Sequence, residues 1–309
     1  MDGLIPLPQP PAERRLGRSA LTVGAIAYGL WRFVGTDVKS ARTRIETALA
    51  HGLTLIDGAA VYGLDWGGTG FGESEALMGA VLADAPALRG RMVLATKCGI
   101  TPGIPYDSSA RAIRESCEAS LRRLRTDVID LFQIHRPDLL AHPAEIADAL
   151  AALREEGKIR EAGVSNHTPA QTAALMHHLP FPLAAVQPEF SALAIEPLES
   201  GLLDLCMEHG LAPLAWSPLA GGLLGADQPP VDARAQRVAG ELRRIAVRED
   251  VTSAAVALAW VLAHPARPVP IIGTQSPERI ADAATALRVR LTRADWYAVL
   301  VASRGTPMP

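Results

Sequence analysis

Short apolar runs alternate with longer amphipathic segments along most of this chain. Eight runs without polar alternation are predicted to be strands: 23–28, 53–57, 92–97, 128–135, 162–165, 184–187, 213–217 and 269–273. Strands of this kind are typical of a parallel sheet that is buried on both faces. The intervening segments predict helices at 39–51, 73–82, 109–124, 143–156, 169–178, 197–209 and, after the last strand, 276–287.

Glycine marks the passage from helix to strand at three places. Gly52, Gly157 and Gly210 each follow an amphipathic segment and precede an apolar run, where a left-handed residue ends a helix. Eight strands alternating with helices favour a (β/α)8 TIM barrel, which forms a single domain over residues 1–309.

Some predicted elements are additional to the eight strands and helices of the barrel. A helix pair at 234–247 and 253–263 precedes the last strand, and a further helix at 292–301 follows the last barrel helix. The segment RRLGRSALTVG near the N-terminus is predicted to form a β-hairpin that plugs the barrel floor. We interpret these as additions to the barrel and not as a second domain.

Composition and charge narrow the function. The chain has 309 residues, 49% of them hydrophobic and 20% charged, with a net charge of −3. These values are ordinary for a globular protein with a sizeable core, and they argue against a nucleic-acid or anionic-membrane surface. Small-molecule chemistry is therefore favoured, in a monomer or weak homo-oligomer whose size the sequence does not specify.

The cysteines and the N-terminus carry no special signal. Cys98, Cys117 and Cys206 are far apart, which favours neither a disulfide framework nor a metal site. The proline-rich N-terminus is unlike a signal peptide, and no apolar run is long enough to span a bilayer. We expect a cytoplasmic protein.

Four titratable residues stand at or just beyond the C-terminal ends of predicted strands: Asp57, Tyr62, Lys97 and His135. Unpaired buried charges are costly, and the strand C-termini of a barrel share one face, where active sites lie. We therefore expect the four to meet. An ammonium lowers the pKa of a nearby phenol, a carboxylate keeps that ammonium charged, and a neutral imidazole can orient a carbonyl oxygen.

The same residues leave other chemistry open. A strand-end lysine such as Lys97 can form a Schiff base, as in an aldolase-like lyase. Cys98 is a conceivable thiolate nucleophile, although a buried, reduced thiol is the simpler interpretation. Tyr28, Trp31 and Trp66 lie at or after the first two strands and can wall an apolar substrate pocket, or simply pack.

Eight strings in order resemble the aldo-keto reductases and cover nearly the whole chain: LIDGAAVYG, GESEALMG, VLATKCG, SLRRLRTDVIDLFQIHRPD, EEGKIREAGVSNHT, VQPEFS, LAWSPLAGGLL and PIIGTQSPERI. The likeness is greatest to the family's bacterial members, many described only as predicted oxidoreductases. It implies NADP(H)-dependent reduction of an aldehyde or ketone, with Tyr62 as general acid, Lys97 and Asp57 as its tuning pair, and His135 orienting the carbonyl. A non-catalytic NADP(H)-binding regulatory protein remains an alternative.

The resemblance also implies a cofactor site. Ser165, Asn166 and Gln187 would contact the carboxamide, and Trp216 would stack on the nicotinamide. The pyrophosphate and adenosine positions would be Ser217, Leu219, Gly221, Gly222, Gly273 and Arg279, with Arg279 on the 2′-phosphate.

The chain departs from the family pattern at three places. Gly58 replaces the usual Thr after the catalytic Asp, and Ala283 replaces an adenine-contacting Asn. A basic residue often found near Gln275 or Ser276 is missing. We therefore expect the 2′-phosphate to rest mainly on Arg279.

Overall fold

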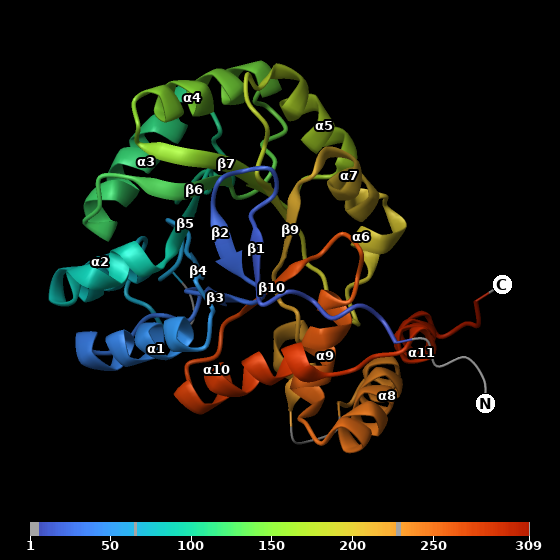
Figure 1. Cartoon of the computed structure of the whole chain (residues 1–309). Coiled ribbons are helices and arrows are strands. Elements are labelled where there is room, and N and C mark those ends of the chain that lie inside the picture. Colours follow the sequence, from blue (N-terminus) through green and yellow to red (C-terminus); the bar gives the residue numbers. More distant parts are fainter. Residues whose placement is uncertain (1–5, 65–66, 227–229, 309) are drawn as a thin grey trace.

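The computed structural model describes residues 6–64, 67–226 and 230–308 and consists of a closed barrel of eight parallel strands surrounded by helices (Figure 1). The barrel strands are β3 (Ala27–Gly29), β4 (Leu55–Asp57), β5 (Val93–Cys98), β6 (Ile129–Ile134), β7 (Ile159–Ser165), β8 (Ala185–Gln187), β9 (Ala212–Ala215) and β10 (Val269–Ile272). The barrel closes where β10 pairs in parallel with both β3 and β9. The predicted (β/α)8 fold is thereby confirmed.

Helices follow most strands and cover the outside of the barrel. The α-helices are α1 (Val38–Ala50), α2 (Glu73–Asp84), α3 (Ala110–Leu124), α4 (Pro143–Glu155), α5 (Pro169–His178), α6 (Glu196–Glu199), α7 (Leu202–His209), α8 (Ala233–Glu249), α9 (Ser253–Leu262), α10 (Pro277–Ala283) and α11 (Arg293–Arg304). Three 3₁₀ segments are η1 (Pro86–Arg91), η2 (Ala220–Gly225) and η3 (Ala284–Arg288). The predicted extra helices correspond to α8, α9 and α11. In the described segments, each helix falls short of the combined length and apolar character needed to cross a bilayer.

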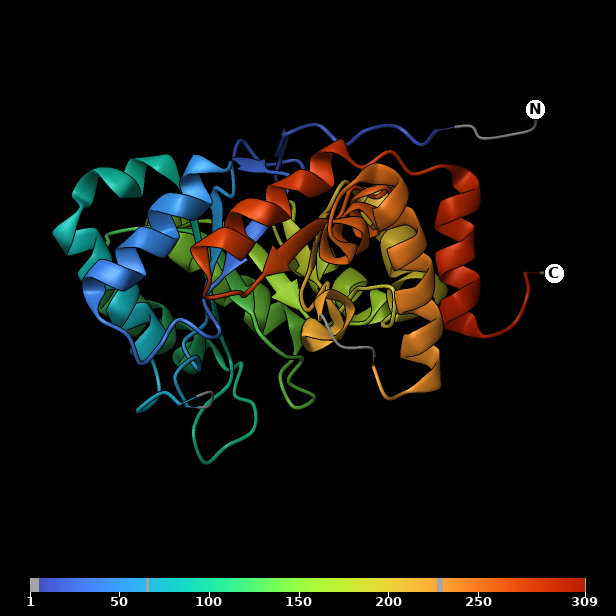
Figure 2. The ribbon, with the colours of Figure 1, turned by 90° about the horizontal axis from the view of Figure 1, so that it is seen from below.

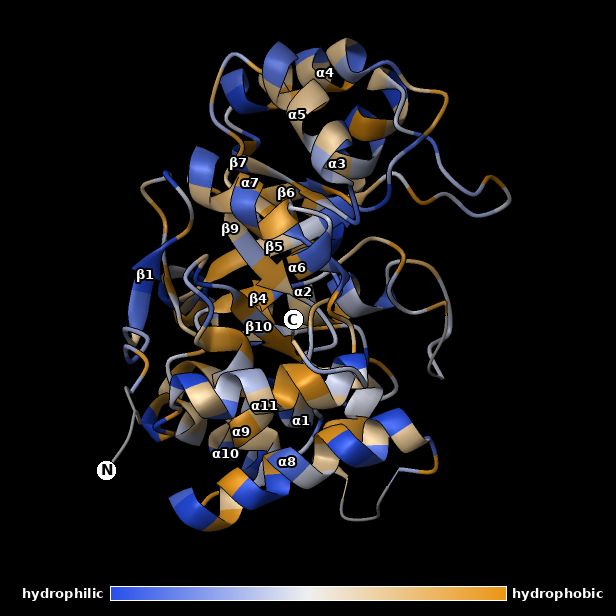
Figure 3. Cartoon of the chain, turned by 90° about the vertical axis from the view of Figure 1, so that its right-hand side faces the viewer, coloured by the Kyte–Doolittle hydropathy of each residue, from blue (hydrophilic) through white to orange (hydrophobic). Residues whose placement is uncertain are grey.

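Two apolar clusters hold the barrel together. The inner cluster includes Ala27, Leu55 and Leu131, whose side chains fill the barrel, and the outer one lies between strands and helices. The apolar strands at the centre and the more polar outer faces of the helices are visible in Figure 3. Burial on both faces explains why the strands appear in the sequence as continuous apolar runs.

A two-stranded hairpin closes the barrel at its N-terminal end. Its strands β1 (Glu13–Arg15) and β2 (Thr22–Gly24) pair antiparallel, and Leu16 and Val23 join the inner cluster. In Figure 2 the hairpin lies at one end of the barrel and the long loops extend from the other. The predicted plug is confirmed.

Two predicted elements prove to be divided. The strand predicted at 23–28 is split between β2 of the hairpin and β3 of the barrel, and the chain passes so close to the end of α1 at Gly24 that a Cβ there would collide with the Gly52 carbonyl. The helix predicted at 197–209 is split into α6 and α7, because Gly201 adopts a left-handed conformation with φ of 81°. Neither feature is visible in hydrophobic periodicity.

Candidate active site

The C-terminal ends of β4, β5 and β6 bring the four predicted titratable residues together. Asp57 is the last residue of β4, Lys97 lies near the end of β5, and His135 directly follows β6. Tyr62 lies in the turn after β4, and its backbone N–H donates to the Ala59 carbonyl. Neighbouring parallel strands end at one edge, so residues distant in sequence become neighbours.

Lys97 is at the centre of this group and is almost completely buried. Its Nζ donates to Asp57 Oδ2 at 2.6 Å, to the Gly58 carbonyl at 2.8 Å and to the Tyr62 hydroxyl at 3.3 Å. Burial opposes the ammonium, but the negative charge of Asp57 and the hydrogen bonds to Asp57 and Tyr62 outweigh it and raise the pKa of Lys97. The lysine is therefore a fixed cation with a phenol as neighbour.

Asp57 is held on its other side by two amides. Its Oδ1 accepts from Gln133 Nε2 at 3.2 Å and from Gln187 Nε2 at 3.0 Å. Gln187, expected from the resemblance to contact a cofactor, thus contacts the carboxylate here. Gln133 was absent from the sequence predictions, although it lies two residues before His135 on a buried strand and so on the same face, which was the available signal.

Tyr62 and His135 face each other across the group. Their ring centroids are 5.9 Å apart in an edge-to-face arrangement. Burial first, then the positive charges of Lys97 and Arg136, lower the pKa of His135 well below its ordinary value. The imidazole is therefore neutral near pH 7 and carries one N–H donor.

These residues lie in the wall of a cavity of about 1240 Å³. Asp57, Tyr62 and His135 contribute to its lining, with Lys97 buried behind them. This volume exceeds the usual range for one drug-sized ligand, about 300–1,000 Å³. The cavity therefore has room for a large ligand together with a smaller one.

One wall of the cavity is a flat indole held by hydrogen bonds. Trp216 Nε1 donates to Asn166 Oδ1 at 3.0 Å, and Asn166 Nδ2 donates to the His135 carbonyl at 3.1 Å and to Ser165 Oγ at 2.9 Å. Ser165 Oγ in turn donates to the Gln187 carbonyl. Ser165, Asn166, Gln187 and Trp216 therefore form one connected network beside His135.

A glycine-rich turn forms the next part of the wall. Gly221 and Gly222 in η2 have φ values of 70° and 107°, and a Cβ on either would meet no atom within 4 Å. The Gly221 N–H donates to Ser217 Oγ at 2.9 Å. Ser217, Leu219, Gly221, Gly222 and Gly225 all line the cavity, so its backbone is open to a ligand.

The remaining predicted cofactor positions lie after β10. Gly273 and Arg279 both line the cavity, and Ser276 caps α10 by accepting from the Arg279 N–H. Arg243 of α8 lines the same cavity. Arg243 was absent from the sequence predictions because an exposed arginine on a helix carries no local sign of the cavity it faces.

Of the three aromatic residues predicted for the substrate pocket, one lines the cavity, one is buried elsewhere and one lies outside the described residues. Trp31 lines the cavity with 38% of its surface exposed. Tyr28 is completely buried in the outer cluster, where its hydroxyl donates to the Thr274 carbonyl. The structure therefore does not bring Tyr28 to the cavity wall, because β3 turns Ala27 toward the barrel interior and Tyr28 outward. Trp66 lies outside the described residues.

Other side chains complete the wall near Tyr62 and His135. Val61, Leu64 and Ile100 are apolar, and Arg136 lines the cavity with its guanidinium carbon 6.0 Å from the Trp216 ring centroid. The wall is therefore mixed, apolar on one part and cationic on another.

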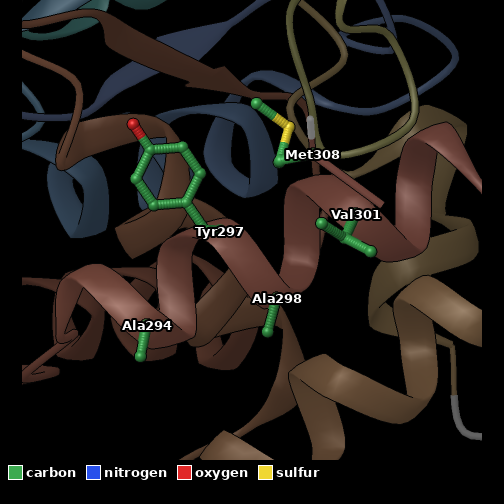
Figure 4. A pocket seen from close by; sticks show the side chains of 5 residues that line it. All are labelled: Ala294, Tyr297, Ala298, Val301 and Met308. Atoms are coloured by element: carbon green, nitrogen blue, oxygen red, sulfur yellow. The ribbon is translucent and has the colours of Figure 1, made fainter. Parts of the chain in front are cut away.

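A second hollow of about 600 Å³ lies on α11, lined by Ala294, Tyr297, Ala298, Val301 and Met308 (Figure 4). Its lining is apolar apart from the Tyr297 hydroxyl. No acid–base pair lies among these five residues, so the barrel cavity is the candidate active site.

Known proteins resemble this chain over nearly its full length. Residues 25–300 match the model of the Aldo/keto reductase family. A 6-dehydroglucose reductase from Novosphingobium aromaticivorans is 51% identical over 98% of this chain and 99% of its own length. A second 6-dehydroglucose reductase, from Agrobacterium fabrum, is 39% identical over 90% and 93%. The crystal structure of a thermostable aldo-keto reductase with the inhibitor epalrestat superposes with a TM-score of 0.80 at 25% identity, covering 94% of this chain and 99% of that one.

Proposed function

Because the chain belongs to the aldo/keto reductase family of oxidoreductases, we propose that it is an NADP(H)-dependent reductase of aldehydes or ketones with Tyr62 as the proton donor. One observation carries the proposal: the Tyr62 hydroxyl lies 3.3 Å from the ion-paired ammonium of Lys97, in the wall of the large cavity. A phenol beside a buried cation is arranged to release a proton.

The cavity wall fits a nicotinamide dinucleotide. The open backbone at Gly221 and Gly222 suits the close approach of phosphate oxygens. Trp216, held by Asn166, offers a flat ring against which a planar heterocycle can stack. Arg279 supplies a guanidinium, whose planar fork matches phosphate.

When bound, the cofactor would supply a hydride to the carbonyl carbon. The imidazole N–H of neutral His135 would hold the carbonyl oxygen, and the Tyr62 hydroxyl would give that oxygen its proton. The ammonium of Lys97 would stabilise the phenolate that remains, while Asp57 keeps the lysine charged and in place. Charge on the substrate oxygen is thereby neutralised as it develops.

A sugar aldehyde is the substrate that we propose to test first. Two relatives, one of them 51% identical, are named 6-dehydroglucose reductases. Trp31 offers an aromatic face and Arg136 offers guanidinium donors, and both line the cavity, a combination that suits a hydroxylated substrate.

The charge state of Lys97 bears on the Schiff-base alternative. A lyase of that type needs a neutral amine, whereas the ion pair with Asp57 at 2.6 Å favours the ammonium. A non-catalytic NADP(H)-binding protein would have no need of this fixed cation beside a phenol. Both alternatives are therefore less consistent with the site than reduction.

The test is a comparison of the wild type with Tyr62→Phe. We expect the wild type to oxidise NADPH in the presence of 6-dehydroglucose or simpler aldehydes, measured as loss of NADPH absorbance. Tyr62→Phe should reduce turnover by at least about 10²-fold, since general acid catalysis contributes about 10²–10⁴, while NADPH still binds, measured by quenching of tryptophan fluorescence. Tyr297→Phe, which alters an exposed tyrosine outside the cavity, is the matched control. Robust turnover by Tyr62→Phe would refute the assignment of the proton donor.

A further inference from the structure

Two arginines from different helices line the cavity wall formed by α8, α9 and α10. Arg243 comes from α8 and Arg279 from the first half of α10. Both are exposed, and in the described part of the chain neither guanidinium has an ion pair or a hydrogen bond. Their positive charge is therefore not neutralised by the protein.

Two neighbouring arginines on α8 are paired with acidic residues, unlike Arg243. Arg244 and Arg248 turn the other way and pair with Asp295 of α11, at 3.0 and 2.9 Å, and each has a second acidic partner. These two arginines attach α8 to α11. Arg243 makes no such attachment, so its charge is available to a ligand in the cavity.

The same wall also holds one carboxylate, whose single negative charge is smaller than the combined positive charge of the two arginines. Asp282 of α10 accepts a hydrogen bond from the Thr252 hydroxyl at 2.8 Å, and Thr252 also caps α9 by accepting from the Ala255 N–H. Thr252, Ser253 and Ala254 at the start of α9 line the cavity too. The positive end of this helix dipole adds to the potential set by the two arginines.

We propose that Arg243 is a specificity-determining residue that, together with Arg279, binds the 2′-phosphate of NADP(H) and sets the preference over NAD(H). This rests on the proposed function. A phosphomonoester carries nearly two negative charges near neutral pH, which two guanidinium forks balance better than one. Arg243 thus supplies from α8 the positive charge that is missing near Gln275 and Ser276.

The test is direct binding, which does not depend on turnover. Isothermal titration calorimetry gives the dissociation constants of four ligands in two pairs. NADPH is compared with NADH, and adenosine 2′,5′-bisphosphate is compared with 5′-AMP. The proteins are the wild type, Arg243→Gln, Arg243→Lys and Arg279→Gln. Arg122→Gln is the control, because Arg122 is an exposed helix arginine outside the cavity lining and the change removes the same charge.

We expect Arg243→Gln to weaken NADPH and adenosine 2′,5′-bisphosphate by about ten- to hundredfold, the usual range for a charge-assisted hydrogen bond. NADH and 5′-AMP should change by less than about twofold, since they lack the 2′-phosphate that a charge-assisted bond requires. Arg243→Lys should be intermediate, because it keeps the charge and loses the fork. Added salt should lower the NADPH preference of the wild type more than that of Arg243→Gln.

The outcomes separate the two proposals. If the ratio of the NADPH and NADH dissociation constants is the same in Arg243→Gln and the wild type, the role of Arg243 is overturned and the reductase proposal stands. Equal affinity of the wild type for NADPH and NADH would likewise overturn the role of Arg243 and leave the reductase proposal standing. Failure of the wild type to bind either dinucleotide overturns the proposed function itself.

Discussion

Replacing Asp57 by asparagine tests how the ion pair at the centre of the site is held. In the structure Asp57 Oδ2 accepts from Lys97 Nζ at 2.6 Å, and Oδ1 accepts from the amides of Gln133 and Gln187. If the side-chain oxygen of the asparagine keeps accepting hydrogen bonds from the two glutamine amides, its NH₂ group points at the Lys97 ammonium. The substitution therefore removes a charge and also places a donor against a donor.

The expected loss is large because both partners are buried. The side chains of Lys97 and Asp57 are 0% and 3% exposed, and removing one partner of a buried pair costs about 3–5 kcal/mol. We expect Asp57→Asn to lower the free energy of unfolding at pH 7 by this amount. Lys97→Met should cost about the same, since it leaves the Asp57 carboxylate buried without its cation.

The double variant Asp57→Asn/Lys97→Met separates pairing from general damage. It leaves neither charge unpaired, so its cost should fall short of the sum of the two single costs by about 2–3 kcal/mol. Urea denaturation at fixed pH gives the four unfolding free energies. Carbonyl reduction should be lost in all three variants, because restoring stability does not restore the cation beside Tyr62.

The pH dependence provides an independent check. In the wild type the raised pKa of Lys97 means that its stabilisation is present below the ordinary value of 10.5 and is lost as pH rises through the higher folded value. In Asp57→Asn burial acts without the partner and lowers that pKa, so the variant should gain stability between about pH 7 and pH 10, below the ordinary lysine pKa. Additive single costs, together with no such gain, would refute this account of the pair.

Two further predictions concern protonation and packing. Burial and nearby cations lower the pKa of His135. Its ring should therefore remain neutral as the pH falls from about 8 to about 6.5, the ordinary pKa of histidine. The measurement is an NMR titration of the ring, with the signal assigned by comparison with His135→Gln, and protonation within this interval would contradict the structure. Gly79→Ala in α2 should destabilise by about 1–3 kcal/mol despite alanine's helix propensity, because its Cβ would collide with the Arg123 carbonyl oxygen. The matched change Gly240→Ala in α8, where a Cβ meets nothing within 4 Å, should stabilise by about 0.5–1 kcal/mol, and equal thermal shifts for the two variants would count against the packing argument.

Much of the fold could be predicted because each barrel strand is buried on both faces and so is apolar throughout. The prediction was wrong where an apolar run contributes to two different sheets, as at 23–28, since periodicity does not say which strand pairs with which. Gly201 had a similar effect on the helix predicted at 197–209. Its left-handed conformation divides that helix, and the pattern of apolar positions continues across it.

Within the candidate site, the residues that could be predicted from the sequence are those at the ends of barrel strands. Asp57, Lys97 and His135 stand at strand ends, so the fold alone is enough to place them together. Tyr28, for which the sequence left a pocket wall and ordinary packing open, packs in the outer cluster, because neighbouring positions along a strand point to opposite faces. Arg243 was not found, since nothing near it in the chain indicates that α8 packs beside the glycine-rich turn.

The sequence by itself determined which residue types stand at the ends of which strands, because strand burial and helix periodicity are local properties. The tertiary structure alone decided that Lys97 meets Asp57, 40 positions away, at 2.6 Å, that Gln133 holds the same carboxylate, and that Arg243 and Arg279 share one wall. Burying a charge is tolerated where a partner lies within hydrogen-bonding distance. That distance is set by the pairing of strands and the docking of helices, which depend on contacts between segments far apart in the chain.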